Sequence, residues 1–202
     1  MAAILTSLRN TVLAGFALAI VLLVIVGLVS GGYNLTFGKG FWLFVVRWLH
    51  VASGVMWIGL LYYFNFVQIP NMPKIPDEQK PAIGKVIAPA ALFWFRWGAM
   101  STITFGILLA LLQEYFVNAV LLGIISKVPN HTMIGIGMWL GAIMWFNVWF
   151  VIWPNQKVAL GLVEGTADQK KAAARKAMLF SRTNTMLSVP MLYAMIATQS
   201  AY

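Results

Sequence analysis

Four residues of one apolar segment could together bind a redox cofactor. Arg47, His50, Gly54 and Trp57 recur at spacings of three and four residues, so a helix would place them on one stripe. The histidine offers a metal-binding nitrogen, and the arginine one turn away offers a positive charge for a propionate group. The glycine leaves a gap that a flat ring could approach. The stripe therefore suits b-type haem, with His50 as the metal ligand.

The sequence leaves a second interpretation of His50 open, because it shows no obvious second axial ligand. A buried histidine can simply form a hydrogen bond with a neighbouring helix. His131, the only other histidine, is expected at the outer end of a later helix, too far out to share one iron with His50. Four methionines could complete the ligand set, although methionine is more often a packing residue. They are Met56, Met100, Met138 and Met144.

Charged side chains are distributed unevenly between the apolar segments and the rest of the chain. Arg47, Arg96 and Arg182 fall inside expected membrane spans, whereas all five acidic residues fall outside them. An arginine at the centre of a membrane helix costs roughly 2.5–3.5 kcal/mol on insertion scales. Haem propionates, a lipid phosphate or an anionic substrate would offset this cost. Otherwise the arginines reach toward the interface or bind backbone carbonyls.

A polar layer is expected in the cytoplasmic third of the membrane. Arg96, Asn147, Arg182 and Asn184 come to similar depths when each helix rises about 1.5 Å per residue. Their hydrogen-bond donors would suit a planar, anionic small molecule. The competing interpretation is that these side chains only hold neighbouring helices together, as polar residues often do in membrane bundles.

Composition determines which elements must position these residues. Of the 202 residues, 61% are hydrophobic and 9% are charged, and the mean hydropathy is +0.83. The sequence therefore predicts an all-α, polytopic membrane helix bundle in a single domain, with the lipid bilayer as its partner. The net charge of +9 is scattered over loops, which argues against nucleic-acid binding. The absence of cysteine excludes thiolate metal sites and c-type haem attachment.

About five spans are expected, at residues 11–31, 41–68, 88–112, 132–154 and 178–199. Residues 116–126 are apolar but too short to cross. With this assignment nine lysines and arginines fall on the side of the N-terminus and two on the other, so the N-terminus and the loops 69–87 and 155–177 are expected in the cytoplasm. The proline-rich loop 69–87 is expected to be irregular, and residues 167–178 to form a short surface helix. No internal repeat is recognised.

Three segments carry a family resemblance. They are RWLHVASGVMWIGLLYYFNFVQIP, IGIGMWLGAIMWFNVWFVIWPN and LFSRTNTMLSVPMLY. Over residues 41–113 and 132–199 the chain resembles the membrane domain of PuuD-type bacterial urate oxidases, the urate oxidase N-terminal family. The resemblance implies a multi-pass protein of the bacterial inner membrane that oxidises urate and passes electrons to a c-type cytochrome. Because the chain has no CxxCH motif, we expect a standalone membrane domain without the cytochrome c domain.

Three functions remain open. The first is a haem b protein that passes electrons from a urate-like heterocycle, bound near Arg96 and Arg182, to a separate cytochrome. The second is a non-catalytic accessory subunit of a larger membrane complex. The third, a small transporter, has less support because no inverted repeat or broken helix pair is seen.

Overall fold

The structure, a computed structural model, describes residues 2–29 and 37–200. The described residues are helical and contain no strand. The chain divides into two compact units, residues 1–45 and 46–202. The first unit holds α1 (Ala2–Leu5), α2 (Leu8–Val29) and the beginning of α3. Because α2 is apolar on every side, it has the composition of a helix that lies in lipid.

The second unit is a bundle of four long helical rods. Three of the rods are composite. The first rod consists of α3 (Lys39–Tyr62), η2 (Tyr63–Gln68), α4 (Ile69–Asn71) and η3 (Met72–Lys74). The second consists of α5 (Lys80–Ala82), η4 (Ile83–Ile87) and α6 (Ala88–Leu112). The third consists of α8 (Pro129–Phe146), η5 (Asn147–Ile152) and α9 (Trp153–Ala159). The fourth rod is α10 (Ala167–Ser200), and the short α7 (Phe116–Val120) precedes α8.

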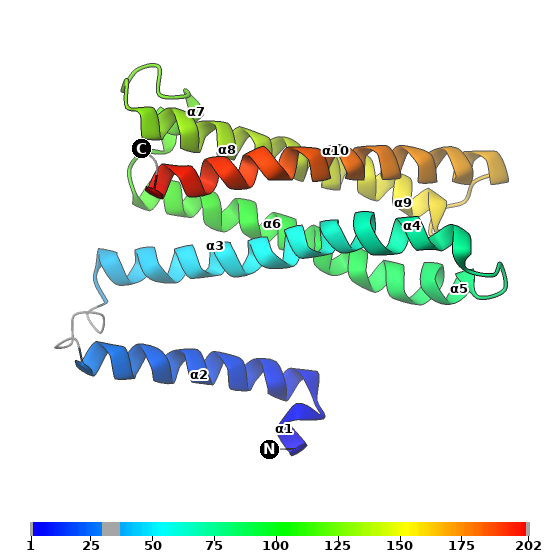
Figure 1. Cartoon of the computed structure of the whole chain (residues 1–202), viewed down its shortest axis with the longest axis horizontal. Coiled ribbons are helices and arrows are strands. Elements are labelled where there is room, and N and C mark those ends of the chain that lie inside the picture. The colour runs from blue at the N-terminus through cyan, green and yellow to red at the C-terminus, as the bar shows by residue number, and fades with distance from the viewer. Residues whose placement is uncertain (1, 30–36, 201–202) are drawn as a thin grey trace. The chain divides into compact units, whose positions relative to one another are not determined.

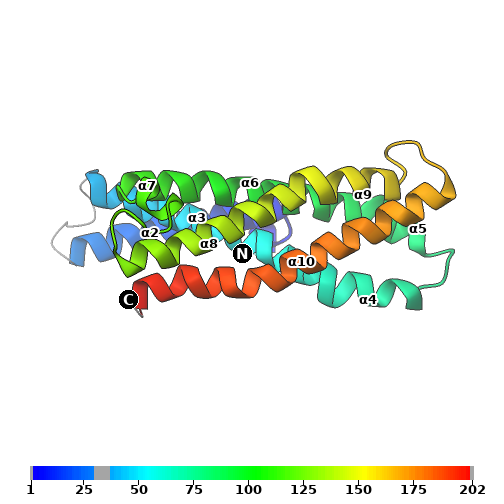
Figure 2. The ribbon, with the colours of Figure 1, turned by 90° about the horizontal axis from the view of Figure 1, so that it is seen from above.

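The rods of this unit bring its basic connectors to one end. Figures 1 and 2 both show α4, α5, α9 and the start of α10 at one end of the bundle, with α7 and the C-terminal end of α10 at the other. The space a Cβ at Gly84 would occupy is 3.9 Å from Leu160, which confirms that the two connectors lie together. We call this the basic end, because Lys74, Lys85 and Lys170 belong to its connectors.

Four helical stretches are long and apolar enough to cross a membrane: Leu8–Val29, Lys39–Lys74, Lys80–Leu112 and Pro129–Ala159. They coincide with the first four predicted spans, except that residues 30 and 31 of the first lie outside the described residues. The all-α membrane bundle is therefore confirmed. The fifth predicted span, 178–199, lies in α10, which is long enough but is interrupted by polar residues such as Arg182 and Asn184, so its crossing stays a prediction.

The second unit has an apolar core, and it also exposes many large apolar side chains on its outer surface. Trp57, Leu61, Phe95 and Met144 are almost completely buried. Large apolar side chains on the outside include Trp94, Phe150, Met186 and Val189. A soluble surface would not carry so many exposed apolar groups, whereas a lipid-facing surface would.

The connectors are shorter and more helical than predicted. Within 69–87 the helices continue to Lys74 and resume at Lys80. Pro81 occupies the first turn of the second rod, where a missing N–H costs no hydrogen bond. The predicted surface helix at 167–178 is the first part of the continuous α10. Residues 116–126 form α7 and turns, and not a spanning helix.

Three π-helical segments interrupt the composite rods, and a proline follows each of them. These are η2 before Pro70, η4 before Pro89 and η5 before Pro154. A proline ring clashes with the carbonyl four residues earlier, and a locally wider turn is a way to avoid that clash. Asn71 and Asn155, one residue beyond two of these prolines, donate to the carbonyls of Val67 and Val151 at 2.7 Å.

This shared local structure reveals an internal repeat that the sequence analysis missed. Residues 56–65, MWIGLLYYFN, and 138–147, MWLGAIMWFN, share Met, Trp, Gly, Phe and Asn at matching positions, and each segment leads to a Pro-Asn pair. Each segment ends at a buried asparagine, Asn65 in the first and Asn147 in the second. Two inserted residues before the second Pro-Asn pair conceal the match. The rods α3–α4 and α8–α9 are therefore built on one pattern.

Candidate functional site

His50 lies against α6, where two small residues make room for it. Its Nδ1 is 2.9 Å from the backbone oxygen of Thr102, and a Cβ at Gly106 would lie only 2.9 Å from the imidazole Cε1. Because a carbonyl oxygen can only accept, Nδ1 carries the proton and Nε2 holds a free lone pair in the neutral ring. No hydrogen bond to Nε2 is found among the described residues. This tautomer is the one in which a histidine binds a metal through Nε2.

The rest of the predicted stripe faces α6 only in part. The Cβ position of Gly54 is 3.9 Å from the Thr102 methyl group, and Trp57 is 1% exposed, with its backbone 3.2 Å from the Cβ position of Gly98. Arg47 is exposed. Burial raises the pKa of the Tyr115 phenol, and the positive charge of Arg47 partly opposes this shift.

The sequence analysis missed the α6 side of this contact. Gly98, Thr102 and Gly106 recur every four residues, a spacing of small residues that lets membrane helices approach closely. Thr102 also donates its hydroxyl to the Gly98 carbonyl at 2.7 Å. The signal was therefore present in the sequence, as a small residue at every fourth position opposite the histidine.

None of the candidate second ligands is placed at His50 by a contact among the described residues. His131 stacks on Tyr115, with ring centroids 6.2 Å apart, and its Nδ1 is 2.8 Å from the Ser126 hydroxyl, at the outer end. Met144 is fully buried in the core, and Met56 is 44% exposed. Among the described residues, no group of three or more histidine or acidic side chains could hold a metal ion.

Two of the four residues assigned to the polar layer, Asn147 and Asn184, bind one another. Asn147 donates to the Asn184 side-chain oxygen at 2.8 Å, and Asn184 donates to the Met144 carbonyl at 2.9 Å. A second part of the layer joins the first rod to α10. There Asn65 donates to the Ser181 hydroxyl at 2.7 Å, and Tyr62 and Ser188 hydroxyls are 2.9 Å apart.

The two arginines of the layer differ in their surroundings. The Arg96 guanidinium carbon lies 3.3 Å from the centroid of the Trp153 ring, and its Nε donates to the Leu92 carbonyl at 3.0 Å. Arg182 is exposed on α10. The structure therefore brings Asn147 and Asn184 together, places Arg96 beside Trp153 on α9, and leaves Arg182 on the outside.

Several buried polar atoms in the same half of the bundle have no hydrogen-bond partner among the described residues. They are the indole nitrogens of Trp57, Trp145 and Trp149 and the amide oxygens of Asn65 and Gln68. Unpaired buried groups are uncommon in folded proteins. Both donors and acceptors are thus left available around the polar layer.

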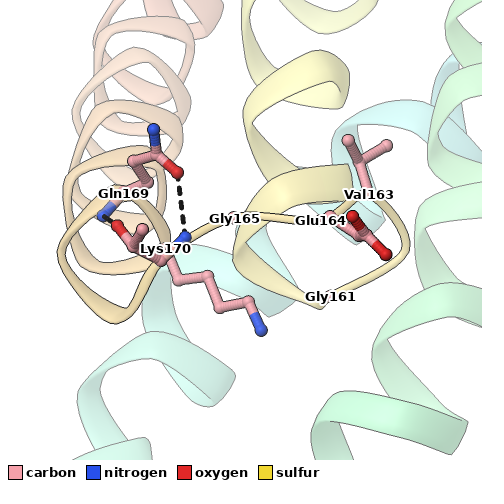
Figure 3. A pocket seen from close by; sticks show the side chains of 7 residues that line it. Gly161, Val163, Glu164, Gly165, Gln169 and Lys170 are labelled. Carbon is pink, nitrogen blue, oxygen red and sulfur yellow. Dashed lines mark hydrogen bonds between the residues drawn. The ribbon is translucent and has the colours of Figure 1, made fainter.

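A surface depression lies away from this layer, at the turn between α9 and α10. Gly161, Glu164, Thr166 and Lys170 are among its lining residues, and Figure 3 shows their arrangement. The depression is shaped by the ends of two helices. Its walls offer no histidine and no aromatic ring, so it is a poor candidate for the predicted cofactor.

Comparison with known proteins identifies a family for the C-terminal part of the chain. Residues 128–202 match the protein-family model described as urate oxidase N-terminal, which confirms the family resemblance over α8, α9 and α10. Asn147, Arg182 and Asn184 fall inside the matched residues, whereas His50 and Arg96 fall outside them. No curated protein and no solved structure matches the chain.

Proposed function

We propose that this chain, whose residues 128–202 match the urate oxidase N-terminal family, is a membrane-embedded redox protein of that type. It would bind haem b through His50 and pass electrons from a small, anionic, urate-like heterocycle to a separate c-type cytochrome. Its location would be the inner membrane of a bacterium.

The hydrogen bond from His50 to the Thr102 carbonyl is the observation that carries the proposal. It fixes the ring orientation and leaves Nε2 as the free metal-binding atom. Outer partners of this kind raise the basicity of a histidine ligand. Arg47, one turn from His50, would neutralise a propionate at the outer end. When bound, the haem would supply a one-electron carrier.

Arg96 supports an anion site at the basic end. Its guanidinium is held by the Leu92 carbonyl and by the face of Trp153. Its terminal nitrogens form no hydrogen bond among the described residues, so they remain available to an anion. A planar arginine stacked on an aromatic ring is suited to a flat heterocycle with in-plane oxygen atoms. The unpaired indole and amide groups of the layer would add further donors and acceptors.

A haemochrome measurement on purified variants tests the haem part of the proposal. We expect a b-type signal near one haem per chain in the native protein, and its loss in His50→Ala. The matched control is His131→Ala, which removes the other histidine at the outer end and should keep the signal. A native protein without haem, or equal loss in both variants at equal folded yield, would contradict the assignment of His50.

One observation favours the accessory-subunit alternative. Asn147, Asn184 and the Met144 carbonyl satisfy one another, as expected of residues that only join helices. In that case the chain should purify without haem and in fixed stoichiometry with other membrane proteins. Mass spectrometry of the complex extracted in mild detergent separates the two functions.

A further inference from the structure

The outer face of α10 carries a basic strip that the proposed redox function does not use. Lys171, Arg175, Leu179 and Arg182 follow one another at spacings of four, four and three residues, which places them on one helix face. All four are exposed. The opposite face, with Ala173, Ala177, Ser181, Asn184 and Ser188, is buried in the bundle. We call the first four residues the α10 strip.

The upper part of the strip borders a surface groove. The groove is an open depression between side chains of α10 alone, lined by Asp168, Lys171, Ala172, Arg175, Lys176 and Leu179. Three of the six lining side chains are cationic and one is acidic. Among the described residues, none of the three cations forms an ion pair. The groove therefore has an uncompensated positive charge.

The strip descends from the basic end into the zone of lipid contact. From Lys171 to Arg182 the helix rises about 16 Å at 1.5 Å per residue. Directly beyond Arg182, Met186 and Val189 are 66% and 65% exposed, so this face would meet acyl chains where α10 crosses the membrane as predicted. Arg182 is thus a cation at the edge of the hydrocarbon, where an unpaired charge is costly.

We propose that the α10 strip and its groove bind the phosphate group of an anionic phospholipid. Arg175 and Lys171 contact the phosphate in the headgroup region, Leu179 and the residues beyond it contact the acyl chains, and Arg182 pairs with the phosphate from below. Arginine suits this role because its fork of donors matches phosphate oxygens. This site faces away from the polar layer, so the test of lipid binding does not depend on whether the protein binds haem.

Native mass spectrometry of the full chain, released from micelles that contain equal amounts of phosphatidylglycerol and phosphatidylcholine, tests the proposal. The native protein should retain phosphatidylglycerol preferentially. Arg175→Gln combined with Arg182→Gln should weaken retention about 30-fold, because each basic residue near an anionic surface contributes about 1 kcal/mol. The matched control is Lys74→Gln with Lys85→Gln, which removes two charges from the same end and should change retention less than threefold.

Three outcomes would overturn the proposal. They are the absence of a preference for phosphatidylglycerol in the native protein, equal losses in the two double variants, and displacement of the lipid by millimolar inorganic phosphate. The last result would mean that the groove binds a free anion and not a lipid. Arg182→Lys should restore part of the retention lost in Arg182→Gln, since it restores the charge but not the forked geometry.

Discussion

At the scale of single residues, Asn184 is the buried side chain through which α10 binds its neighbouring rod. Its side chain is fully buried, accepts a hydrogen bond from Asn147 and donates one to the Met144 carbonyl. Both partners lie on the rod formed by α8 and η5. Asn184 therefore joins α10, the least apolar of the four rods, to its neighbour.

Asn184→Ala should lower the free energy of unfolding by about 1–3 kcal/mol, because it leaves a buried donor and a buried acceptor without partners. Unfolding in mixed micelles with increasing dodecyl sulfate measures this change. The control is Thr183→Ala, since the Thr183 hydroxyl only contacts the Leu179 carbonyl of its own helix. Equal stability of the two variants would show that the layer contributes nothing to folding.

Residue types revealed the candidates, but not their partners. His50, Asn147 and Asn184 could be selected from the sequence because polar residues inside apolar spans are rare. Their contacts depend on how far each helix is displaced along its neighbour, which no local pattern specifies. Thus His50 was named without its contacts Thr102 and Gly106, and Arg182 was grouped with Arg96 although it is exposed.

At the scale of elements, the turn between α9 and α10 is defined by two capping structures. Gly161, with φ of 75°, ends α9. The Leu162 N–H donates to the Lys157 carbonyl at 2.8 Å, which is the six-to-one hydrogen bond of a Schellman motif. Thr166 and Gln169 then form a capping box, in which each backbone N–H donates to the other side chain, at 2.8 and 3.3 Å. Figure 3 shows Gly161 and Gln169 on the two sides of the turn.

Thr166→Ala should destabilise the first turn of α10 by about 0.5–2 kcal/mol, as the loss of an N-cap does. Hydrogen exchange at the amides of residues 167–170 should accelerate, while exchange in the buried part of α10 should not change. Gln169→Glu serves as the control because glutamate preserves the capping box. Unchanged exchange after Thr166→Ala would contradict the assignment of this cap.

The element boundaries were predictable where helix propensity determines them, and not where proline combines with tertiary packing. The predicted spans coincide with helices. The connector 69–87 appeared irregular in sequence because it holds four prolines. Yet Pro81 occupies a first-turn position that tolerates proline, and the first rod continues through Pro70 after the π-helical η2. The π-helical segments could have been predicted from Pro70, Pro89 and Pro154 only if each helix was known to continue through its proline.

At the scale of the whole molecule, composition gave the correct architecture. The low charge content and long apolar stretches predicted a membrane bundle, and the four spanning helices confirm it. The internal repeat was missed because only a few positions match in MWIGLLYYFN and MWLGAIMWFN and an insertion follows them. The final asparagine of each copy donates to α10, Asn65 to the Ser181 hydroxyl and Asn147 to the Asn184 side chain.

At this scale the proposed function requires a path for electrons between a donor site near Arg96 and a haem bound at His50. An anaerobic titration of the purified, oxidised protein with urate, followed by the visible absorption of the haem, tests this claim most directly. We expect urate to reduce the haem in the native chain and to do so far more slowly in Arg96→Gln, which keeps its haem. A native chain that carries haem but stays oxidised in excess urate would contradict the proposed electron path.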